Sequence, residues 1–259
     1  MEKSLTIKTI KGMLRTTFIG QKVQYLKSTT STMDIARRNA EGGAPEGAVV
    51  LAEQQTGGRG RFDRVWISPP GVNLYFSMIL YPKTESLPFI NMIAALSIVR
   101  AIRTITGLDA VIKWPNDVKV NEKKVSGILV ESKISSEGYA FLILGVGINV
   151  NFDPEAYEEI AATASSLMRE SGREVNRIKL LTTILEEFEQ LYMNIGDGYE
   201  LQKAWKACLE TLGLRIKVRQ MGHLEEGVAI NTDSFGNLLL RRKDNSIVVL
   251  YAGEVTTQI

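Results

Sequence analysis

The stretch AVIKWPNDVKVNEKKVSGILVESKISSEGYAFLILGVGINV, residues 110–150, decides the fold. It contains three strand-like runs, 110–120, 124–134 and 139–150, rich in β-branched and aromatic residues. Short turns at Asn121-Glu122 and Ser135–Gly138 separate them. Because such short connections cannot hold a crossover helix, the runs predict an antiparallel meander.

Upstream of this stretch, strands and helices alternate. Ser31 is a candidate N-cap for a helix that ends at Gly42-Gly43. Apolar residues recur at helical spacing over 88–105 and again over 176–213. Further strands are expected at 23–27, 48–54 and 73–80. The pattern predicts an α+β fold with a mixed, largely antiparallel sheet flanked by helices.

The last part of the chain changes character after Leu212-Gly213. IKVRQ, EEGVAINTD, NLLLRRK and IVVLYAGEV read as four short strands joined by turns. They predict a small barrel-like β module that packs on the main domain. We therefore expect three segments: an N-terminal lead at 1–22, a catalytic domain at 23–212, and the β module at 213–259.

Composition excludes several classes of protein. The 259 residues are 44% hydrophobic and 23% charged, with a net charge of +2, so nothing demands a nucleic-acid partner. No apolar run approaches the roughly 18 residues of a membrane span. The N-terminus lacks the apolar core of a secretory signal. The single cysteine, Cys208, and the single histidine, His223, exclude disulfides and most zinc sites, and a reducing cytoplasmic setting fits.

Four motifs carry candidate chemistry. The loop Gly57–Arg61, followed by Arg64, has three glycines and three arginines, suited to holding phosphate or carboxylate. It is equally compatible with a flexible surface turn or an RNA contact. The segment Lys113–Asp117 places a lysine, an amide and a carboxylate around a proline that interrupts a strand. This arrangement suits a site that binds a metal ion with phosphate, and it equally suits an ordinary turn.

The other two motifs are weaker alone. Lys124 opens a strand, and Gly127 inside that strand marks close approach of a ligand or another backbone. Gly145-Val146-Gly147 resembles the start of a dinucleotide fingerprint, but Val150 stands where the third small residue belongs and the setting is a strand. A Rossmann site is therefore not expected.

Taken in order, GGRGR, KWPND, KxxGILVE and GxGIN resemble the catalytic domain of biotin–protein ligases. Thr30-Ser31-Thr32 and the segment 52–55 resemble the family's flanking segments, and GVAINTDSFGNLLL resembles its small SH3-like module. The resemblance covers about 23–255. It implies the sheet of class II synthetases and biotin ligases with a C-terminal SH3-like β-barrel. Met33 stands where an asparagine often follows the TST segment, which puts one polar contact in doubt.

The resemblance implies an ATP-dependent, AMP-forming ligase. Biotin and ATP, with Mg²⁺, would give biotinyl-5'-AMP and pyrophosphate, and biotin would then pass to the target lysine of a biotin carboxyl carrier protein or domain. No winged-helix domain precedes 23, so we expect no DNA binding; we also expect no membrane contact, and leave a homodimer open. The implied biotin-binding residues are Ser31, Thr32, Gln55, Gly58, Arg59, Lys124 and Gly127. Those implied for ATP or the adenylate are Arg59, Arg61, Arg64, Trp66, Asn116, Lys124 and Asn149. Arg61, Lys124 and Asp117 are the implied catalytic residues, and Asp117 is the candidate metal ligand.

Two alternatives remain at this point. A lipoate or octanoate ligase-like enzyme of the related fold would be expected to carry an RRxSGGGAVxH-type loop, whereas this chain has GGRGR and no histidine there. A nucleic-acid-binding module would use the same loop and the terminal β module, but the net charge and the lack of an aromatic series argue against it.

Overall fold

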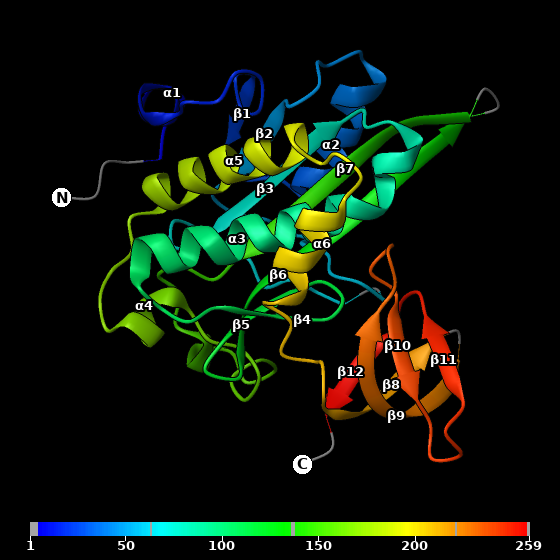
Figure 1. The fold of residues 1–259 in the computed structure, drawn as a ribbon. Coiled ribbons are helices and arrows are strands. Elements are labelled where there is room, and N and C mark those ends of the chain that lie inside the picture. The colour runs from blue at the N-terminus through cyan, green and yellow to red at the C-terminus, as the bar shows by residue number, and fades with distance from the viewer. Residues whose placement is uncertain (1–4, 63, 136–137, 221, 258–259) are drawn as a thin grey trace.

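The computed structural model describes residues 5–62, 64–135, 138–220 and 222–257 (Figure 1). The helices are α1 Ile7–Met13, α2 Thr32–Glu41, α3 Ile90–Thr106, α4 Leu167–Ser171, α5 Arg177–Met193 and α6 Tyr199–Lys206, with 3-10 helices at Thr84–Phe89 and Pro154–Ala156. The strands are β1 Val23–Leu26, β2 Val49–Ala52, β3 Leu74–Leu80, β4 Val111–Lys113, β5 Asp117–Val120, β6 Lys123–Ser135 and β7 Gly138–Ile148, followed by β8 Arg215–Gln220, β9 His223–Thr232, β10 Leu238–Arg241, β11 Ile247–Leu250 and β12 Glu254–Thr257.

The main sheet has seven strands in the order β1-β2-β3-β7-β6-β5-β4. β1 pairs with β2 in parallel, and every other neighbouring pair of this sheet is antiparallel. The predicted meander is confirmed as β5, β6 and β7. Asn121 and Glu122 form its first turn with positive φ angles of 47° and 66°. Of the second turn, residues 136–137 lie outside the described residues.

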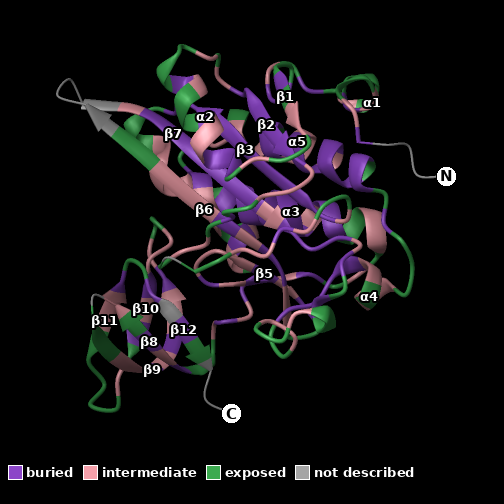
Figure 2. Ribbon diagram, turned by 180° about the vertical axis from the view of Figure 1, so that it is seen from behind, coloured by how far each residue is buried: buried purple, intermediate pink, exposed green. Residues whose placement is uncertain are grey.

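The two faces of the sheet are covered differently. Helices α3 and α5 pack on one face, and α2 packs on the other, as the two opposite views show (Figures 1 and 2). Alternation along β7 follows this division, because successive side chains of a strand point to opposite faces. The residues facing α3 and α5 are Leu142, Leu144, Val146 and Ile148. Phe141 and Ile143 face α2, and Gly145 and Gly147 continue that row without side chains.

The helix boundaries follow their capping residues. Ser31 caps α2, its side chain accepting a hydrogen bond from the Met33 backbone N–H, as predicted. Gly107, in the left-handed region at φ 78°, ends α3. The segment Thr84–Thr106 is long and apolar enough to cross a membrane, but 61% of its most apolar stretch is buried inside the protein. A helix in the core of a folded domain can meet the same criteria of length and apolar composition.

The C-terminal module contains five strands, in the order β11-β10-β9-β8-β12, where the sequence pattern predicted four. The run IVVLYAGEV splits into β11 and β12 because the chain turns at Tyr251–Gly253. β12 then pairs with β8, which carries the end of the chain to the far edge of the sheet. This arrangement is consistent with an SH3-like module.

A turn of this module packs into the main domain. Gly236, at φ 81°, lies against Met92, and a Cβ there would come within 2.4 Å of the Met92 Cε. The Trp114 indole N–H donates to the Gly236 carbonyl oxygen at 2.9 Å. Trp114 precedes Pro115 across a cis peptide bond. The module is therefore fixed to the KWPND segment.

Residues 1–22 were expected to be a short lead, but the described part is folded against the main domain. Thr6 and Thr9 form a capping box at the start of α1, and Leu5, Ile10 and Ile19 are buried in the core. The buried Glu189 carboxylate of α5 accepts hydrogen bonds from the backbone N–H groups of residues 17–19 and from the Thr17 hydroxyl. No periodic pattern of apolar residues predicts this packing, because helix α1 is short.

Glu189 should be a pH-dependent stability determinant. Burial by itself raises the pKa of its carboxyl, but the hydrogen bonds from Phe18, Thr17 and Ile19 outweigh burial, so the pKa lies below its usual value. Glu189→Gln should lower the free energy of unfolding by about 2–3 kcal/mol at pH 7. A carboxyl with a depressed folded pKa stabilises fully above its unfolded pKa of about 4.3, and this contribution is lost as the pH falls through the folded pKa.

The measurement is urea unfolding of wild type and variant at pH 7 and pH 3, where the difference should shrink at the lower pH. Glu187→Gln is the matched control, since Glu187 lies on the same helix and pairs with Arg100 at 3.4 Å near the surface. Its effect should stay within about 1 kcal/mol. Equal effects of the two substitutions would contradict the assigned role of Glu189.

Candidate active site

A cavity of about 930 Å³ lies between the α2 face of the sheet, the loop that contains residues 59–67, and one edge of the C-terminal module. Its lining includes every residue proposed from sequence except Gly58: Ser31, Thr32, Gln55, Arg59, Arg61, Arg64, Trp66, Asn116, Asp117, Lys124, Gly127 and Asn149. Segments that lie far apart in the sequence therefore meet at one place.

The floor of the cavity is sheet backbone without side chains, which we call the glycine floor: Gly127 on β6 with Gly145 and Gly147 on β7. Gly127 and Gly147 are direct cross-strand partners. Trp66 lies on this pair, because a Cβ on Gly147 would be 2.5 Å from the indole Nε1. Met33 lies on Gly145, where a Cβ would be 2.7 Å from the thioether sulfur. The spacing that resembled a nucleotide fingerprint is thus a packing requirement.

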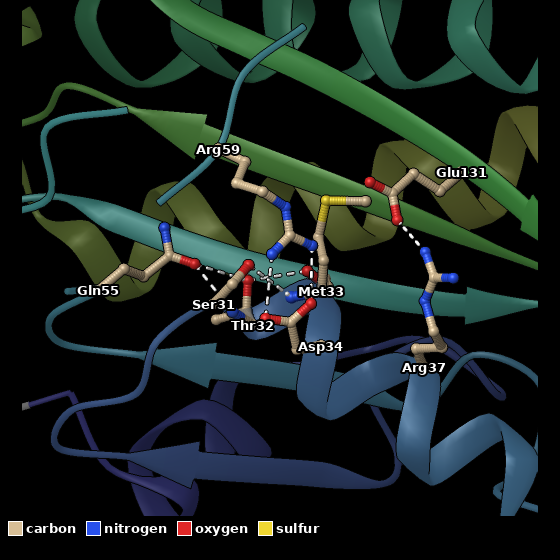
Figure 3. Close-up of polar contacts among 9 residues, drawn as sticks. Ser31, Thr32, Met33, Asp34, Arg37, Gln55, Arg59 and Glu131 are labelled. Carbon is tan, nitrogen blue, oxygen red and sulfur yellow. Dashed lines mark hydrogen bonds and ion pairs between the residues drawn. The ribbon is translucent and has the colours of Figure 1, made fainter. Parts of the chain in front are cut away.

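One wall of the cavity carries uncharged polar groups, at the start of α2 (Figure 3). The Gln55 amide oxygen accepts from the Thr32 backbone N–H at 2.9 Å and from its hydroxyl at 3.1 Å. The Thr32 hydroxyl also contacts the buried Ser77 hydroxyl at 2.8 Å. The Gln55 amide nitrogen donates to Ser68. These contacts fix the side chains of Thr32 and Gln55 before any ligand arrives.

The glycine-rich loop is a compact hairpin. The Trp66 N–H donates to the Gly58 carbonyl oxygen at 2.9 Å, and the Gly60 N–H donates to the Arg64 carbonyl oxygen at 2.7 Å. Gly58 is expected from the sequence to allow close approach of a ligand. A Cβ there would lie 2.5 Å from the Trp66 carbonyl oxygen, so the loop's own packing also excludes a side chain. Arg59 turns back to form an ion pair with Asp34.

The opposite wall is cationic. Arg61 donates to the Asn116 side-chain oxygen at 2.8 Å and to the Gly253 carbonyl oxygen at 3.3 Å, which links the loop to the C-terminal module. The Lys124 ammonium lies 2.7 Å from the Asp117 carboxylate and 5.3 Å from the centre of the Trp66 ring. Together with Arg64 at the rim, these groups surround one end of the cavity with positive charge.

The two asparagines expected to meet ligand are partly committed to the fold. Asn116 donates its amide hydrogen to the Ile128 carbonyl oxygen at 2.8 Å, which ties the KWPND turn to β6. Asn149 is buried and donates to the Ser165 carbonyl oxygen at 3.0 Å. Each amide is therefore held in a fixed orientation, and the Asn116 oxygen also accepts from Arg61.

Sequence reasoning gave no role to several lining residues. Lys113 is one: burial lowers the pKa of its ammonium below the usual value, although Asp117 opposes the shift. The position of Lys113 within the KWPND motif is the sequence feature that could have marked it as a residue of the site. The cavity is also lined by Glu159, Ile160, residues 162–164, Gly253, Val255 and Thr256. No motif marks them, since they come from a turn segment and from the last strand of another sheet.

A metal site built from protein ligands alone does not fit. Among the residues that the structure describes, no group of three or more histidine, cysteine, aspartate or glutamate side chains could hold a metal ion. Asp117 is the predicted carboxylate, and Lys124 already contacts it. Mg²⁺ usually keeps several waters and is bound by one or two carboxylates with substrate phosphates, so Asp117 suits an ion that arrives with a nucleotide.

Adding one methyl group to the glycine floor should displace Trp66. Gly147→Ala places a Cβ about 2.5 Å from the indole, and we expect a loss of about 1–3 kcal/mol in unfolding free energy together with a changed near-ultraviolet circular dichroism spectrum. Gly12→Ala is the control, because Gly12 lies in α1 with no atom within 4 Å of an added Cβ. An unchanged spectrum and stability in Gly147→Ala would refute the packing of Trp66 on this floor.

Comparisons with known proteins agree with this geometry. Residues 25–149 match the model of the biotin/lipoate A/B protein ligase family. The chain is 33% identical over 247 residues to a bifunctional ligase/repressor BirA of Bacillus spizizenii, covering 93% of this chain and 76% of that protein. It is 34% identical over 203 residues to a biotin–[acetyl-CoA-carboxylase] ligase of Paracoccus denitrificans, covering 75% of this chain and 84% of the relative.

Solved structures give the same result. The biotin protein ligase of Aquifex aeolicus in complex with biotin and ATP superimposes with a TM-score of 0.77 at 30% identity, over 92% of this chain and 99% of that one. The fold class expected from the sequence is thereby confirmed. On the extent of these matches, the chain belongs to the biotin–protein ligase family.

Proposed function

We propose that this protein activates biotin with ATP and transfers it to a lysine of a biotin carboxyl carrier protein or domain. The observation that carries the proposal is one cavity with a fixed, uncharged polar wall beside Thr32 and a cationic wall around Lys124. Biotin has the matching asymmetry, with a neutral ureido head and an anionic carboxylate. The relatives named as biotin ligases support the same reaction and a carboxylase carrier as the acceptor.

The uncharged wall is proposed to receive the ureido head. Thr32, Gln55 and Ser31 supply short polar groups next to apolar surface from Met33 and Trp66. A pocket of this kind orients a neutral ligand through a few hydrogen bonds and excludes water elsewhere. The fixed contacts among Thr32, Gln55 and Ser77 support preorganised binding, because little side-chain freedom remains to be lost.

The cationic wall is proposed to serve the first chemical step. A carboxylate oxygen of biotin attacks the α-phosphorus of ATP and forms a new P–O bond. The bond between the α-phosphorus and the oxygen that bridges to the β-phosphate breaks, and pyrophosphate leaves with that oxygen and the bonding electrons. Both reactants are anions, so Arg61, Arg64 and Lys124 would offset their repulsion and stabilise charge that develops on the phosphoryl oxygens. Asn116 holds the Arg61 guanidinium, which supports a positioned rather than a mobile cation.

The second step is attack of a neutral lysine amine on the acyl carbon, with AMP as the leaving group. At pH 7 only about one lysine in a thousand is neutral, so the amine must lose a proton. Asp117 is the proposed acceptor or orienting group, and Lys124, 2.7 Å away, would stabilise the oxyanion. Asp117 also remains the candidate carboxylate for the Mg²⁺ that accompanies ATP.

The proposed adenine contacts involve Trp66 and Asn149. Trp66 packs on the glycine floor rather than standing free as a stacking face. Asn149 keeps its side-chain oxygen for an adenine edge because its amide nitrogen is used by Ser165. We also propose the division into a catalytic domain, 23–212, and a C-terminal module, 213–259, and a cytoplasmic location; a homodimer remains an open prediction.

Incubation of the purified protein with ATP, Mg²⁺ and biotin tests the function directly. Biotin-dependent pyrophosphate release and biotinyl-5'-AMP formation are expected, followed by transfer to a carrier domain and not to its Lys→Arg variant. Lipoate or octanoate in place of biotin tests the related-fold alternative. Activation of those acids without activation of biotin would overturn the proposal.

Removing a cation from the proposed phosphate site should slow adenylate formation. Arg61→Ala and Lys124→Ala are each expected to lower the rate of biotin-dependent pyrophosphate release at least about tenfold, because charge-assisted contacts strengthen in the transition state. Lys123→Ala, which removes a lysine from the neighbouring position of the same strand, is the control and should stay within about twofold. Near-normal rates in both active-site variants would remove Arg61 and Lys124 from the mechanism.

We further propose that this chain does not bind DNA specifically. Its net charge is only +2, and its described residues are accounted for by the ligase fold and the β module. An electrophoretic shift assay at physiological salt, with biotin and ATP present, should show no specific complex with double-stranded DNA. A sequence-specific complex would contradict this part of the proposal.

A further inference from the structure

Arg59 and Asp34 form a two-bonded ion pair at the edge of the cavity (Figure 3). The Arg59 Nη2 donates to one carboxylate oxygen of Asp34 at 2.7 Å, and its Nη1 donates to the other at 3.0 Å. This bidentate geometry adds directional specificity to the ion pair. Arg59 therefore points toward the first turn of α2, and both of its terminal nitrogens are used.

The pair completes a row of contacts between two segments. The Thr56 N–H donates to the Thr29 carbonyl oxygen at 2.9 Å, and the Gly57 N–H donates to the Thr30 carbonyl oxygen at 2.8 Å. Arg59 then reaches Asp34. The beginning of the glycine-rich loop is thus tied to residues 29–34, the same segment that presents Ser31 and Thr32 to the cavity.

We propose that the Asp34–Arg59 ion pair is a positioning device. It holds the first half of the glycine-rich loop against the uncharged wall beside Thr32, so that the biotin pocket is formed before biotin binds. This inference rests on the proposed function. It assigns Arg59 to the loop's position rather than to ligand contact, unlike the sequence-based expectation. The second half of the loop is held separately, through Arg61 and its contacts with Asn116 and Gly253.

The pair should act on binding more than on global stability. Its side chains are 38% and 40% exposed, and pairs this open to solvent contribute little to the unfolding free energy. A glycine-rich loop, however, has large conformational entropy when it is free. If the ion pair already holds the loop in the binding geometry, the entropy loss on ordering it no longer weakens ligand binding. The pKa of the Asp34 carboxyl lies below its usual value, mainly through its hydrogen bonds from Arg59, so the pair stays ionised at neutral pH.

The same helix offers a matched control. Arg37, one turn later on α2, pairs with Glu131 of β6, with side chains 44% and 28% exposed (Figure 3). This second pair ties α2 to the sheet and not to the loop. Similar exposure on the same helix means that a general effect of losing a surface ion pair would appear in both.

The experiment compares Asp34→Ala, Arg59→Ala and the reversed pair D34R/R59D with Arg37→Ala and Glu131→Ala. Calorimetric titration gives the Kd for biotin, pyrophosphate release gives kcat at saturating biotin, and trypsin cleavage after Arg61 and Arg64 without ligand reports loop opening. We expect Asp34→Ala and Arg59→Ala to weaken biotin binding about tenfold and to accelerate cleavage, with kcat within about threefold. The control variants should change none of these quantities.

The reversed pair decides between positioning and direct contact. It should recover most of the lost affinity and protection, although an arginine in the first turn of α2 is disfavoured by the helix dipole. If Arg59→Ala weakens binding while Asp34→Ala does not, or if reversal recovers nothing, Arg59 contacts ligand directly and the inference is wrong. If wild type shows no biotin-dependent pyrophosphate release, the proposed function fails, while cleavage rates of the ligand-free variants still test the pair.

Discussion

The site depends on a patch of one sheet face where glycines leave the backbone without side chains. Gly127, Gly145 and Gly147 keep their ladder hydrogen bonds, so the sheet stays continuous while one face offers only backbone. Glycine in a strand interior weakens a sheet, and the neighbouring strand β3, which is buried along its whole length, compensates through its packing. The space left by the missing side chains is filled in part by Trp66 and Met33 and otherwise forms the cavity.

Charge in the site is organised before any substrate is present. Arg61, Lys124 and Arg59 each contact an oxygen of Asn116, Asp117 or Asp34. These partners differ in kind. A neutral amide contacts Arg61, whereas carboxylates contact Lys124 and Arg59. Lys124 therefore becomes fully available only when Asp117 takes another partner.

Sequence reasoning reached the elements whose signals are local. The meander over 110–150 and the cap at Ser31 follow from spacing and turn chemistry, and the structure has both, whereas the clustering of motif residues was implied by the family resemblance. It failed where long-range packing decides. The helix α1 is too short for a periodic pattern, and the packing of the loop around Gly58 depends on Trp66, eight residues away. The direction of Arg59 depended on Asp34, 25 residues away, which no motif connects to it.

The attachment of the C-terminal module has a consequence for the order of synthesis. Trp114 is locked by the carbonyl of Gly236, and the cavity is closed by Gly253, Val255 and Thr256, all of which leave the ribosome after every other part of the site. A nascent chain that has already formed its main sheet would still have an open phosphate end, and Arg61 would lack its contact with the Gly253 carbonyl oxygen. The site can therefore be completed only after β12 has left the ribosome. A chain that has not yet released this strand would lack part of the cavity wall.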